Sequence, residues 1–538
     1  MIQISSLRLP VDHSEAQLRS AVLSALKCHE DDLLSFSVLK RSIDARKHRK
    51  EGVIFNYMLQ ADVADEASVF AACGSDPNIQ PLKERHYAFA SREASEAEDR
   101  PVIIGAGPCG LFAALLLARH GQRPILLERG KPVGPRARDV TSHWREGTEI
   151  HPDSNVQFGE GGAGAFSDGK LYTQIKDREH RTRWILDQLA EHGAPSDILT
   201  KGRPHIGTDK LMKVLRQLRN AIEDLGGEYR FETRVDSFDI EKGKLHGITT
   251  STGEEIQCHR AILAVGHSAR DTFAALKAAG ISMEAKPFSI GARIEHPQKV
   301  IDSAFFGRQA GHPLLGSSPY KFVHHGKNSN RTTYSFCMCP GGLVVGSSSE
   351  PGGVVTNGMS SYARDEANAN SGFMVEVRPE DFEDPEDPLS GIAFQRRWEQ
   401  MAYQVGGNDY HAPAQRLGDF LAKRPSREAG DVAPSYRPGV VWTDLRECLP
   451  EFITDAIREA IPHIARKIPD FALEDAVLTA AETRSSSPLR IDRDEDSLQC
   501  PSATGLYPAG EGAGYAGGIV SAAVDGLRVA EKILENAR

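Results

Sequence analysis

Three glycines, Gly105, Gly107 and Gly110, are spaced as G-x-G-x-x-G, the pattern with which a strand–turn–helix unit binds the pyrophosphate of a dinucleotide. The first glycine permits a tight turn, and the others let backbone N–H groups approach phosphate oxygens. The N-terminus of the following helix adds partial positive charge. The spacing therefore predicts binding of NAD, NADP or FAD.

The residues around this motif have the types that the pattern requires. PVIIG predicts a short buried strand at 101–105, LFAALLLARHG a helix at 111–121, and PILLE a second strand that ends at Glu128. A carboxylate at Glu128 would accept hydrogen bonds from the ribose hydroxyls of adenosine. It would also repel a 2′-phosphate, so NADP is disfavoured at this site.

A second glycine-rich stretch, GAGYAG at 512–517, lies between a predicted strand and a predicted helix near the end of the sequence. Only about one helix follows it, so no further strand and acid complete another nucleotide site. We interpret it as a second contact for the same cofactor, with Glu511 at the strand end and a helix that begins near Gly518. FAD is long enough to need both contacts, whereas NAD leaves the second without a role. The helix dipole would stabilise negative charge on the reduced flavin.

Cys337 and Cys339, in SFCMCPGG, are the candidates for catalytic residues. Residues i and i+2 of a strand face the same side, so both thiols are expected to point into one cavity. A redox pair near the flavin, half of a metal site and buried structural cysteines are the alternatives. The structural role is favoured, because nothing nearby in sequence lowers a thiol pKa and C-x-C alone is poor evidence for zinc. No metal site is predicted.

Three arginines, Arg484, Arg490 and Arg493, precede the C-terminal glycine motif in ETRSSSPLRIDRD. Guanidinium forks suit carboxylates and phosphates, so these residues are candidates for binding an anionic substrate or bracing the flavin. Ion-paired or surface arginines are an equal alternative. His267 follows the AILAVG strand and is expected to pack rather than transfer protons, and Ser268 is expected to cap the next helix. No catalytic acid or base is identified.

Size and composition limit the classes of protein that this chain can be. It has 538 residues, enough for two or three domains, and a formal net charge of −10. Such acidity argues against nucleic acid and anionic membranes as partners. No apolar run near the fingerprint is long enough to span a bilayer, no signal peptide is recognised, and cysteines without a C-x-x-C pair indicate reduced thiols. We expect a cytoplasmic protein with a small-molecule substrate.

Patterns along the sequence divide the chain into five parts. Residues 1–80 read as strand, helix, strand and strand, which suits a small ferredoxin-like α+β module, and residues 81–100 form a polar linker. Residues 101–280 and 481–538 are expected to form one doubly wound, Rossmann-like α/β domain that binds FAD and is split in sequence. Residues 281–480 lack clear periodicity and are interpreted as an inserted α+β cap domain that shapes the substrate pocket.

Several segments together resemble the FAD-binding proteins of the glutathione-reductase-like superfamily. The stretch at 102–130 resembles their N-terminal fingerprint, FETRV and AILAVG their middle segments, and GLYPAGEGAGYAGGI their flavin-contact motif, which usually has Asp where this chain has Glu511. SNVQFGEGGAGAFSDGKLYT, SFCMCPGG and ETRSSSPLRI resemble an uncharacterised group of bacterial FAD-dependent dehydrogenases. The resemblance implies that the backbone at Val235 contacts adenine and that 264–266 lie beside the cofactor.

The motifs and the resemblance together predict one set of cofactor-binding residues. We expect FAD to be held by Gly105, Ala106, Gly107, Pro108, Cys109, Gly110, Glu128, Arg129, Val235, Gly266, Gly510, Glu511, Gly517, Gly518 and Ile519. GEGGAG at 159–164 matches the dinucleotide pattern only in spelling, because no helix is predicted after it. It is expected to form a glycine-rich loop near the flavin.

The combined prediction is an FAD-dependent oxidoreductase, a dehydrogenase or reductase that transfers hydride through flavin N5 to or from a small molecule. No separate nicotinamide domain is recognised. The electrons are therefore expected from NAD(P)H docked transiently over the flavin, or from a reduced substrate or an electron-transfer protein. Three alternatives stay open: a flavoprotein acting on RNA through its N-terminal module and the basic hairpin at 40–52, one whose FAD is structural, and a flavin monooxygenase. A solvated loop is the simpler interpretation of the hairpin.

Overall fold

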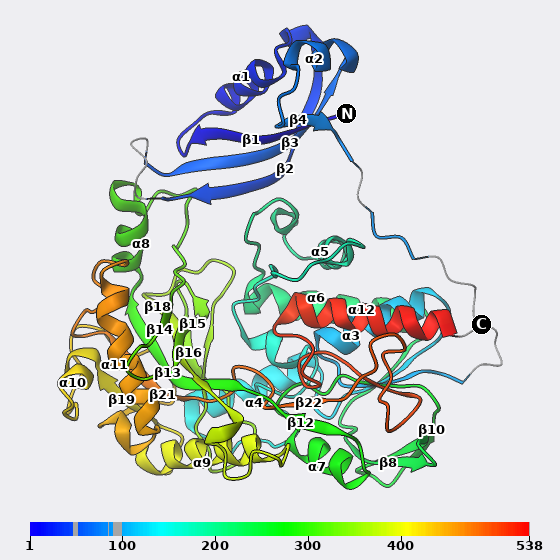
Figure 1. The fold of residues 1–538 in the computed structure, drawn as a ribbon, viewed down its shortest axis with the longest axis vertical. Helices are drawn as coiled ribbons and strands as arrows, with labels where there is room; N and C mark the ends of the chain where they lie inside the picture. Colours follow the sequence, from blue (N-terminus) through cyan, green and yellow to red (C-terminus); the bar gives the residue numbers. More distant parts are fainter. Residues whose placement is uncertain (47–51, 84–85, 90–98, 537–538) are drawn as a thin grey trace.

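The computed structural model describes residues 1–46, 52–83, 86–89 and 99–536. Figure 1 shows a small sheet with two helices at the top, a large sheet at the lower left and a parallel sheet with its helices at the lower right. The predicted hairpin at 40–52 and the predicted linker at 81–100 lie partly outside the described residues. No helix in the described part of the chain is both long and apolar enough to cross a membrane.

A parallel five-stranded sheet carries the first glycine motif. Its order is β23-β11-β5-β6-β7, and every neighbouring pair is parallel. The strands are β5 (Val102–Ile104), β6 (Ile125–Leu127), β7 (Glu228–Arg230), β11 (Ala261–Leu263) and β23 (Leu506–Pro508). Since β23 comes from near the end of the sequence, the sheet joins segments about 400 residues apart along the chain, which is the Rossmann-like assembly that the two glycine motifs predict.

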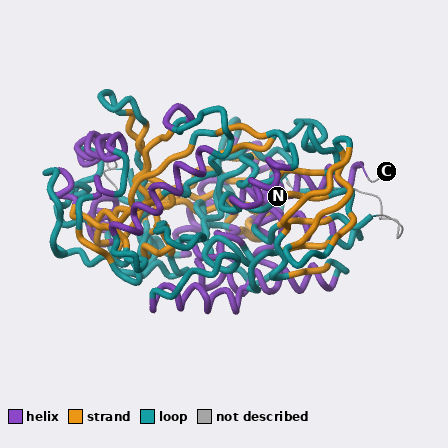
Figure 2. The backbone as a smooth tube through the Cα atoms, turned by 90° about the horizontal axis from the view of Figure 1, so that it is seen from below, coloured by secondary structure: helices purple, strands orange, loops and turns teal. Residues whose placement is uncertain are grey.

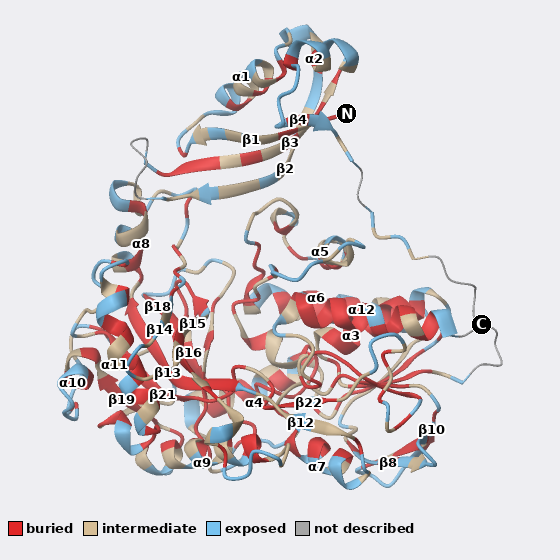
Figure 3. Cartoon of the chain, in the orientation of Figure 1, coloured by how far each residue is buried: buried red, intermediate tan, exposed pale blue. Residues whose placement is uncertain are grey.

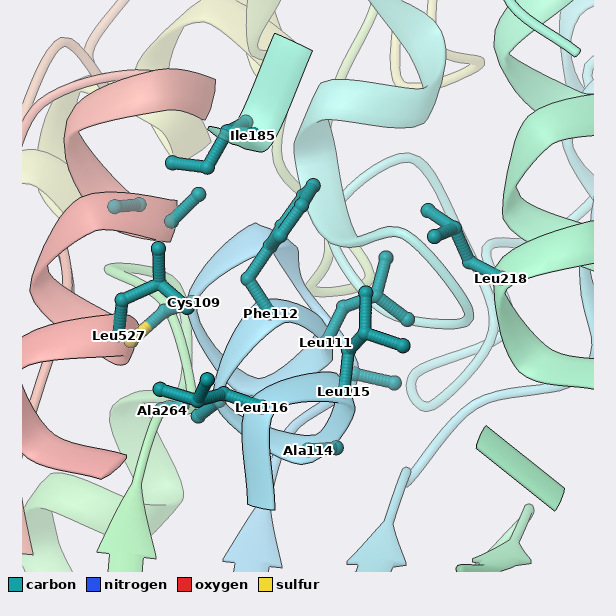
Figure 4. Close-up of a cluster of buried hydrophobic side chains, with 14 of the residues drawn as sticks. Cys109, Leu111, Phe112, Ala114, Leu115, Leu116, Ile185, Leu218, Ala264 and Leu527 are labelled. Atoms are coloured by element: carbon teal, nitrogen blue, oxygen red, sulfur yellow. The ribbon is translucent and has the colours of Figure 1, made fainter. Parts of the chain in front are cut away.

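The helix after the first motif is buried on all sides. Helix α3 (Pro108–Arg119) packs between the sheet and α12 (Ile519–Asn536), so its apolar residues need no polar face. Figure 3 shows both helices largely buried, and Figure 4 shows the cluster in which α3 meets Ile185, Leu218 and Leu527. Close approach requires glycine, because a Cβ at Gly526 would lie 2.1 Å from the carbonyl oxygen of Cys109.

Further elements cover both faces of the parallel sheet. On the α3 face lie α4 (Val133–Glu146), α5 (Arg181–Glu191) and α6 (Gly207–Asp224). On the opposite face lie α7 (Arg270–Ala278) and an antiparallel sheet of β8 (Val235–Glu241), β9 (Lys244–Thr250) and β10 (Glu255–Gln257). The sequence YRFETRVDSFDI, predicted as one β-like run, is divided between β7 and β8, because residues 231–234 carry the chain from one sheet to the other.

The region without predicted periodicity contains a seven-stranded sheet in the order β14-β15-β18-β13-β21-β19-β20. Its strands are β13 (Phe288–Pro297), β14 (Val323–His325), β15 (Thr332–Cys339), β18 (Asn368–Val377), β19 (Ala412–Arg416), β20 (Val440–Trp442) and β21 (Val477–Glu482). Its helices are α8 (Gln298–Phe306), α9 (Ser390–Val405), α10 (Leu417–Leu421) and α11 (Glu451–Ala465). Two strand pairs complete this part, β12 (Met283–Ala285) with β22 (Leu489–Ile491) and β16 (Leu343–Gly346) with β17 (Thr356–Met359). Strand β21 continues past residue 480, where the cap domain is predicted to end. The domain boundaries stay predictions.

The first four N-terminal elements follow the predicted order of strand, helix, strand and strand, and the structure adds a second helix and a fourth strand. The elements are β1 (Ile2–Pro10), α1 (Glu15–Leu26), β2 (Leu33–Asp44), β3 (Ile54–Val63), α2 (Glu66–Cys73) and β4 (Ile79–Pro81), and the sheet order is β2-β3-β1-β4. A backbone bridge joins this part to the rest, because Arg41 N–H donates to Thr200 O at 2.7 Å and Gly202 N–H donates to Arg41 O at 2.8 Å. The view from below (Figure 2) shows the strands gathered towards two ends of the molecule.

Candidate cofactor and substrate site

A cavity of about 360 Å³ brings together segments that are far apart in the sequence. It lies between the turn after β5, the loop at 162–170, the ends of β11 and β15, and the start of α12. The predicted cofactor residues that line it are Gly105, Gly107, Pro108, Cys109, Glu128, Arg129, Val235, Gly266, Glu511, Gly517, Gly518 and Ile519. Both glycine motifs therefore face one space, as a single extended ligand requires.

The glycines of the two motifs leave room in front of two helix N-termini. A Cβ added to Gly107 would meet nothing closer than Gly162 Cα at 3.9 Å, and one added to Gly517 would meet nothing within 4 Å. Gly107 is the N-cap of α3 and has no side chain to bond the N–H groups of the first turn. These donors and the helix dipole are thus available to an anionic group in the cavity.

The predicted residues that do not line the cavity hold its walls in place. Gly110 allows α3 to approach β5, because a Cβ there would lie 1.9 Å from Gly105 O. Gly510 has a positive φ of 74°, and its N–H donates to Asp525 at 2.8 Å. Ala106 donates its N–H to Glu128 at 2.8 Å. These three residues do not line the cavity, and their contacts support residues that do; contact of any predicted residue with the cofactor stays a prediction.

Glu128 is buried and already bonded to the backbone of two loops. One carboxylate oxygen accepts the N–H of Ala106, and the other accepts those of Gly130 and Gly159, both at 2.9 Å. The carboxylate therefore ties the first glycine turn to the second glycine-rich loop. Its oxygen Oε2 has a single described donor and retains capacity for a further hydrogen bond. Contact with a ribose stays a prediction.

Charged residues near Val235 form a network at the same part of the cavity wall. Arg129 lies 2.7 Å from both Asp153 and Asp271, and its guanidinium stacks 4.1 Å from the Phe158 ring. Arg234 also pairs with Asp153, at 3.4 Å. Because each arginine has a carboxylate partner, this wall is ordered without presenting a free charge.

Glu511 lies beside the N-terminus of α12. The N–H of Gly518 points to its carboxylate at 3.4 Å. Burial raises the pKa of Glu511 to about 7, although the Gly518 hydrogen bond and the nearby Lys286 oppose that rise. The folded protein therefore holds a proton on Glu511 at a pH where the unfolded chain has released it.

We expect Glu511→Gln to change the pH dependence of stability. Between pH 4.5 and about 7 the unfolded chain binds fewer protons than the folded one, so the wild type loses stability as the pH rises through this window. Glutamine does not titrate, so the melting temperature of the variant minus that of the wild type should grow from pH 5 to pH 8 in protein without added ligand. A difference that stays constant with pH would contradict the raised pKa.

The two cysteines line the cavity but are not a simple alternating pair. Strand β15 has an irregularity between Phe336 and Cys339, and Cys337 has a left-handed φ of 41°. Both residues line the cavity as predicted. The predicted reason, that residues i and i+2 of a regular strand face the same side, is wrong because the bulge redirects the backbone. Cys339 is buried and Cys337 is exposed. The interpretation as a buried structural cysteine therefore fits Cys339 and does not fit Cys337.

The carbonyl of Cys337 anchors the bulge. The Cys339 thiol donates to it at 3.1 Å, and the guanidinium of Arg293 donates to it as well. Although Cys337 is accessible from the cavity, desolvation by the surrounding protein raises the pKa of its thiol to about 12, and the nearby Lys170 and Arg293 only partly oppose that rise. A thiol with this pKa is protonated at neutral pH and is not an activated nucleophile.

The three candidate arginines all have partners. Arg484 lies 3.0 Å from Glu399, Arg493 lies 2.9 Å from Asp525, and Arg490 stacks 4.6 Å from the ring of Tyr515. Only Arg484 lines the cavity. The ion-paired alternative describes Arg484 and Arg493 better than a free anion site does, and Arg490 stacks on an aromatic ring outside the cavity.

Glu399 is the centre of a buried ion cluster behind the cavity wall. It pairs with Arg270 at 2.7 Å and with Arg484 at 3.0 Å, and all three side chains are at most 3% exposed. Burial alone would raise the pKa of Glu399, but the two arginines hold it well below its usual range. Arg270 reaches a further carboxylate, Glu350, at 2.6 Å.

His267 lines the cavity next to this cluster. Burial, Arg484 and Arg270 lower its pKa to about 3, so the imidazole is neutral at physiological pH. Packing without proton transfer is consistent with that state. Ser268 does not cap α7, whose N-cap is Ala269; its hydroxyl donates to Gln157 at 3.0 Å instead. Among the described residues, no group of three His, Cys, Asp or Glu side chains is arranged to hold a metal ion.

Sequence reasoning missed three charged residues of the cavity, Arg234 beside the predicted Val235, and the pair of Asp168 and Lys170. Asp168 and Lys170 follow the glycine-rich loop at 159–164, which does reach the cavity through Gly162, Ala163 and Gly164. Asp168 is buried and pairs with Lys170 at 3.1 Å and with Arg364 at 2.6 Å. A charged pair directly after a loop predicted near the flavin was the available signal.

Comparisons with known proteins match three separate parts of the chain to family models. A family model described as FAD-dependent protein, C-terminal domain-like, matches residues 287–485, one described as an NAD(P)-binding Rossmann-like domain matches 103–159, and a domain of unknown function matches 1–62. An uncharacterized protein of Clostridium beijerinckii is 43% identical over 534 residues, which are 99% of this chain and 98% of that protein.

Two other similarities are more limited. Protein FixC of Escherichia coli K12 is 28% identical over 229 residues, which are 40% of this chain and only 49% of FixC. Among solved structures, CtdE in complex with FAD aligns with 81% of this chain and 84% of its own, with a TM-score of 0.32 and 12% identity. A likeness at this TM-score says nothing about activity.

Proposed function

The chain belongs to a family of FAD-dependent proteins that includes the uncharacterized protein of Clostridium beijerinckii, and we propose that it is a cytoplasmic FAD-dependent oxidoreductase acting on a small molecule. The observation that carries this proposal is the single cavity faced by both glycine motifs. Bound FAD would supply hydride transfer through its N5 atom, and the protein would supply orientation and electrostatics.

The residues present fit an extended FAD. The wall with Glu128 and Val235 suits the adenosine, and the open space at Gly107 suits the pyrophosphate, which the free N–H groups of α3 would bind. The start of α12 with Gly517 and Gly518 suits the flavin end, since a Cβ at either glycine would meet nothing within 4 Å.

The chain's own groups at the flavin end orient a ligand and set its electrostatics. The N-terminus of α12 and Lys170 place positive potential in the cavity, which would favour the anionic reduced cofactor over the neutral oxidised one. Neutral His267 and the protonated Cys337 thiol add no negative charge there. Removal of the proton that accompanies a hydride is not assigned to any side chain.

We expect NADH or NADPH to reduce the bound flavin. The nucleotide would dock transiently, because no separate nicotinamide domain is recognised in the sequence. The test is an anaerobic titration of the purified protein, followed by the visible absorbance of the flavin. Bleaching by either nucleotide supports a nicotinamide-driven enzyme. Retention of the absorbance with both nucleotides would reject that donor and leave a reduced substrate or a partner protein, and a flavin resistant also to dithionite would reject the oxidoreductase.

A further inference from the structure

Lys170 presents a positive charge to the cavity that the protein only partly neutralises. Its ammonium group lies 3.1 Å from Asp168, which is its one carboxylate partner within 4.0 Å among the described residues. The same carboxylate is bonded by both arms of Arg364, at 2.8 and 2.6 Å. Two cations thus share one anion, and the cluster of Asp168, Lys170 and Arg364 has an excess charge of +1.

The donors of Lys170 have no other ionic partner. An ammonium group has three N–H donors, and a single contact to Asp168 leaves at least two of them for a ligand. The Lys170 side chain is 23% exposed, whereas Asp168 is 1% exposed, so the lysine is the member of the pair that a ligand reaches.

Neighbouring groups do not supply the missing negative charge. The Cys337 thiol beside Lys170 is protonated at neutral pH, because its pKa is raised to about 12. Glu482, a buried carboxylate that acts on Cys337, is bonded to Arg293 at 2.6 Å. Arg484, a further cation of the cavity wall beside Arg129 and Arg234, already donates through Nε and both Nη atoms to Glu399 and to the Ser349 hydroxyl. Lys170 is therefore better placed than the three arginines of 482–494 to bind an anion.

We propose that Lys170 binds the anionic group of the substrate, a carboxylate or a phosphate, at the end of the cavity next to the Cys337 bulge; this rests on the proposed function. An ammonium group binds either oxyanion as a point charge, so one chemistry covers both. Phe336 and Tyr172 also line the cavity, and they suit an apolar body attached to the anionic group.

Substitution of Lys170 is not expected to unfold the protein, because the buried carboxylate of Asp168 keeps another partner. Arg364 still bonds both oxygens of Asp168 in Lys170→Met, so no carboxylate is left unpaired. Lys170→Arg keeps the charge and serves as the matched control. The experiment uses the FAD-loaded protein and measures FAD content, calorimetric binding and the visible spectrum of the flavin with benzoate, its neutral analogue benzamide, and inorganic phosphate.

The wild type is expected to bind benzoate or phosphate saturably and to bind benzoate at least about tenfold more tightly than benzamide, because a charge-assisted hydrogen bond contributes about that factor. Lys170→Met should lose this preference with FAD content unchanged, and Lys170→Arg should retain it. Benzoate and phosphate distinguish the two oxyanions, and binding of either through Lys170 supports the proposal.

Three results would overturn the inference: no saturable binding of either anion by the wild type, unchanged anion affinity in Lys170→Met, or loss of FAD in that variant, which would make Lys170 a cofactor ligand. Absence of FAD from the wild type would instead reject the proposed function, and the FAD measurement separates that failure from the others.

Discussion

Gly107→Val is expected to lower the affinity for FAD by on the order of a hundredfold or more while the protein stays folded. The valine side chain would occupy the space in front of the α3 N-terminus, where the pyrophosphate is proposed to bind. The substitution creates no strain in the protein itself, because Gly107 has φ −74° and a Cβ there meets nothing closer than 3.9 Å. Flavin content after purification and the dissociation constant of added FAD measure the effect.

Gly134→Val is the matched control for this substitution. Gly134 lies at the start of α4, its added Cβ meets nothing within 4 Å, and it does not line the cavity. The control should retain FAD and melt within a few degrees of the wild type. Normal FAD binding by Gly107→Val would show that the cofactor does not lie against this turn.

Glu399→Ala should lower the free energy of unfolding of the part that contains it by about 3 to 5 kcal/mol, the usual cost of removing one partner from a buried ion pair. The substitution leaves the guanidinium of Arg484 without a carboxylate inside the protein, and Arg270 keeps only Glu350. Glu399→Gln retains the shape but keeps only the hydrogen bonds to its one remaining oxygen, because its NH2 group cannot accept from a guanidinium. Its free energy of unfolding should fall between those of the wild type and Glu399→Ala. Urea unfolding followed by tryptophan fluorescence gives the midpoints.

An exposed pair provides the comparison for this prediction. Arg183 and Asp187 lie one helical turn apart in α5, with side chains 48% and 42% exposed. Asp187→Ala should cost less than about 1 kcal/mol, because water screens such a pair. If Glu399→Ala cost no more than Asp187→Ala, the buried cluster would not be the stabilising element inferred from its geometry.

The glycine motifs made the parallel sheet predictable from the sequence. Strands β5, β6, β11 and β23 are short, uniformly apolar and next to turns whose glycines have defined roles, so local pattern and tertiary role coincide. The sequence also predicted that both motifs meet at one cavity. FAD is long enough to contact both, and too little chain follows the second motif to complete another nucleotide site.

The seven-stranded sheet could not be predicted in the same way. Strand β13 is buried at nearly every position, yet it includes Arg293, Glu295 and His296, each 0% exposed. These polar residues are buried because distant segments satisfy them: Arg293 bonds to Glu482, and Glu295 accepts from Ser435 and Asn368. Such partners hide the alternation on which a strand prediction depends.

The same distance effect hid the charged residues of the site. Asp168 and Arg364 are 196 residues apart, and Arg270 and Glu399 are 129 apart. Apart from its place directly after the glycine-rich loop, nothing local distinguishes Lys170 from a surface lysine, since its environment is made by the bulge at Cys337 and by the Asp168–Arg364 pair. The arginines at 482–494 were conspicuous in sequence, but their partners lie elsewhere in the chain and neutralise them.

The most direct test of this account is to denature the purified protein and to identify and count the flavin that it releases. The account predicts one FAD per chain, released without covalent attachment. Absence of flavin, attachment that survives denaturation, or release of FMN, which lacks the adenosine that the Glu128 wall is proposed to hold, would contradict it.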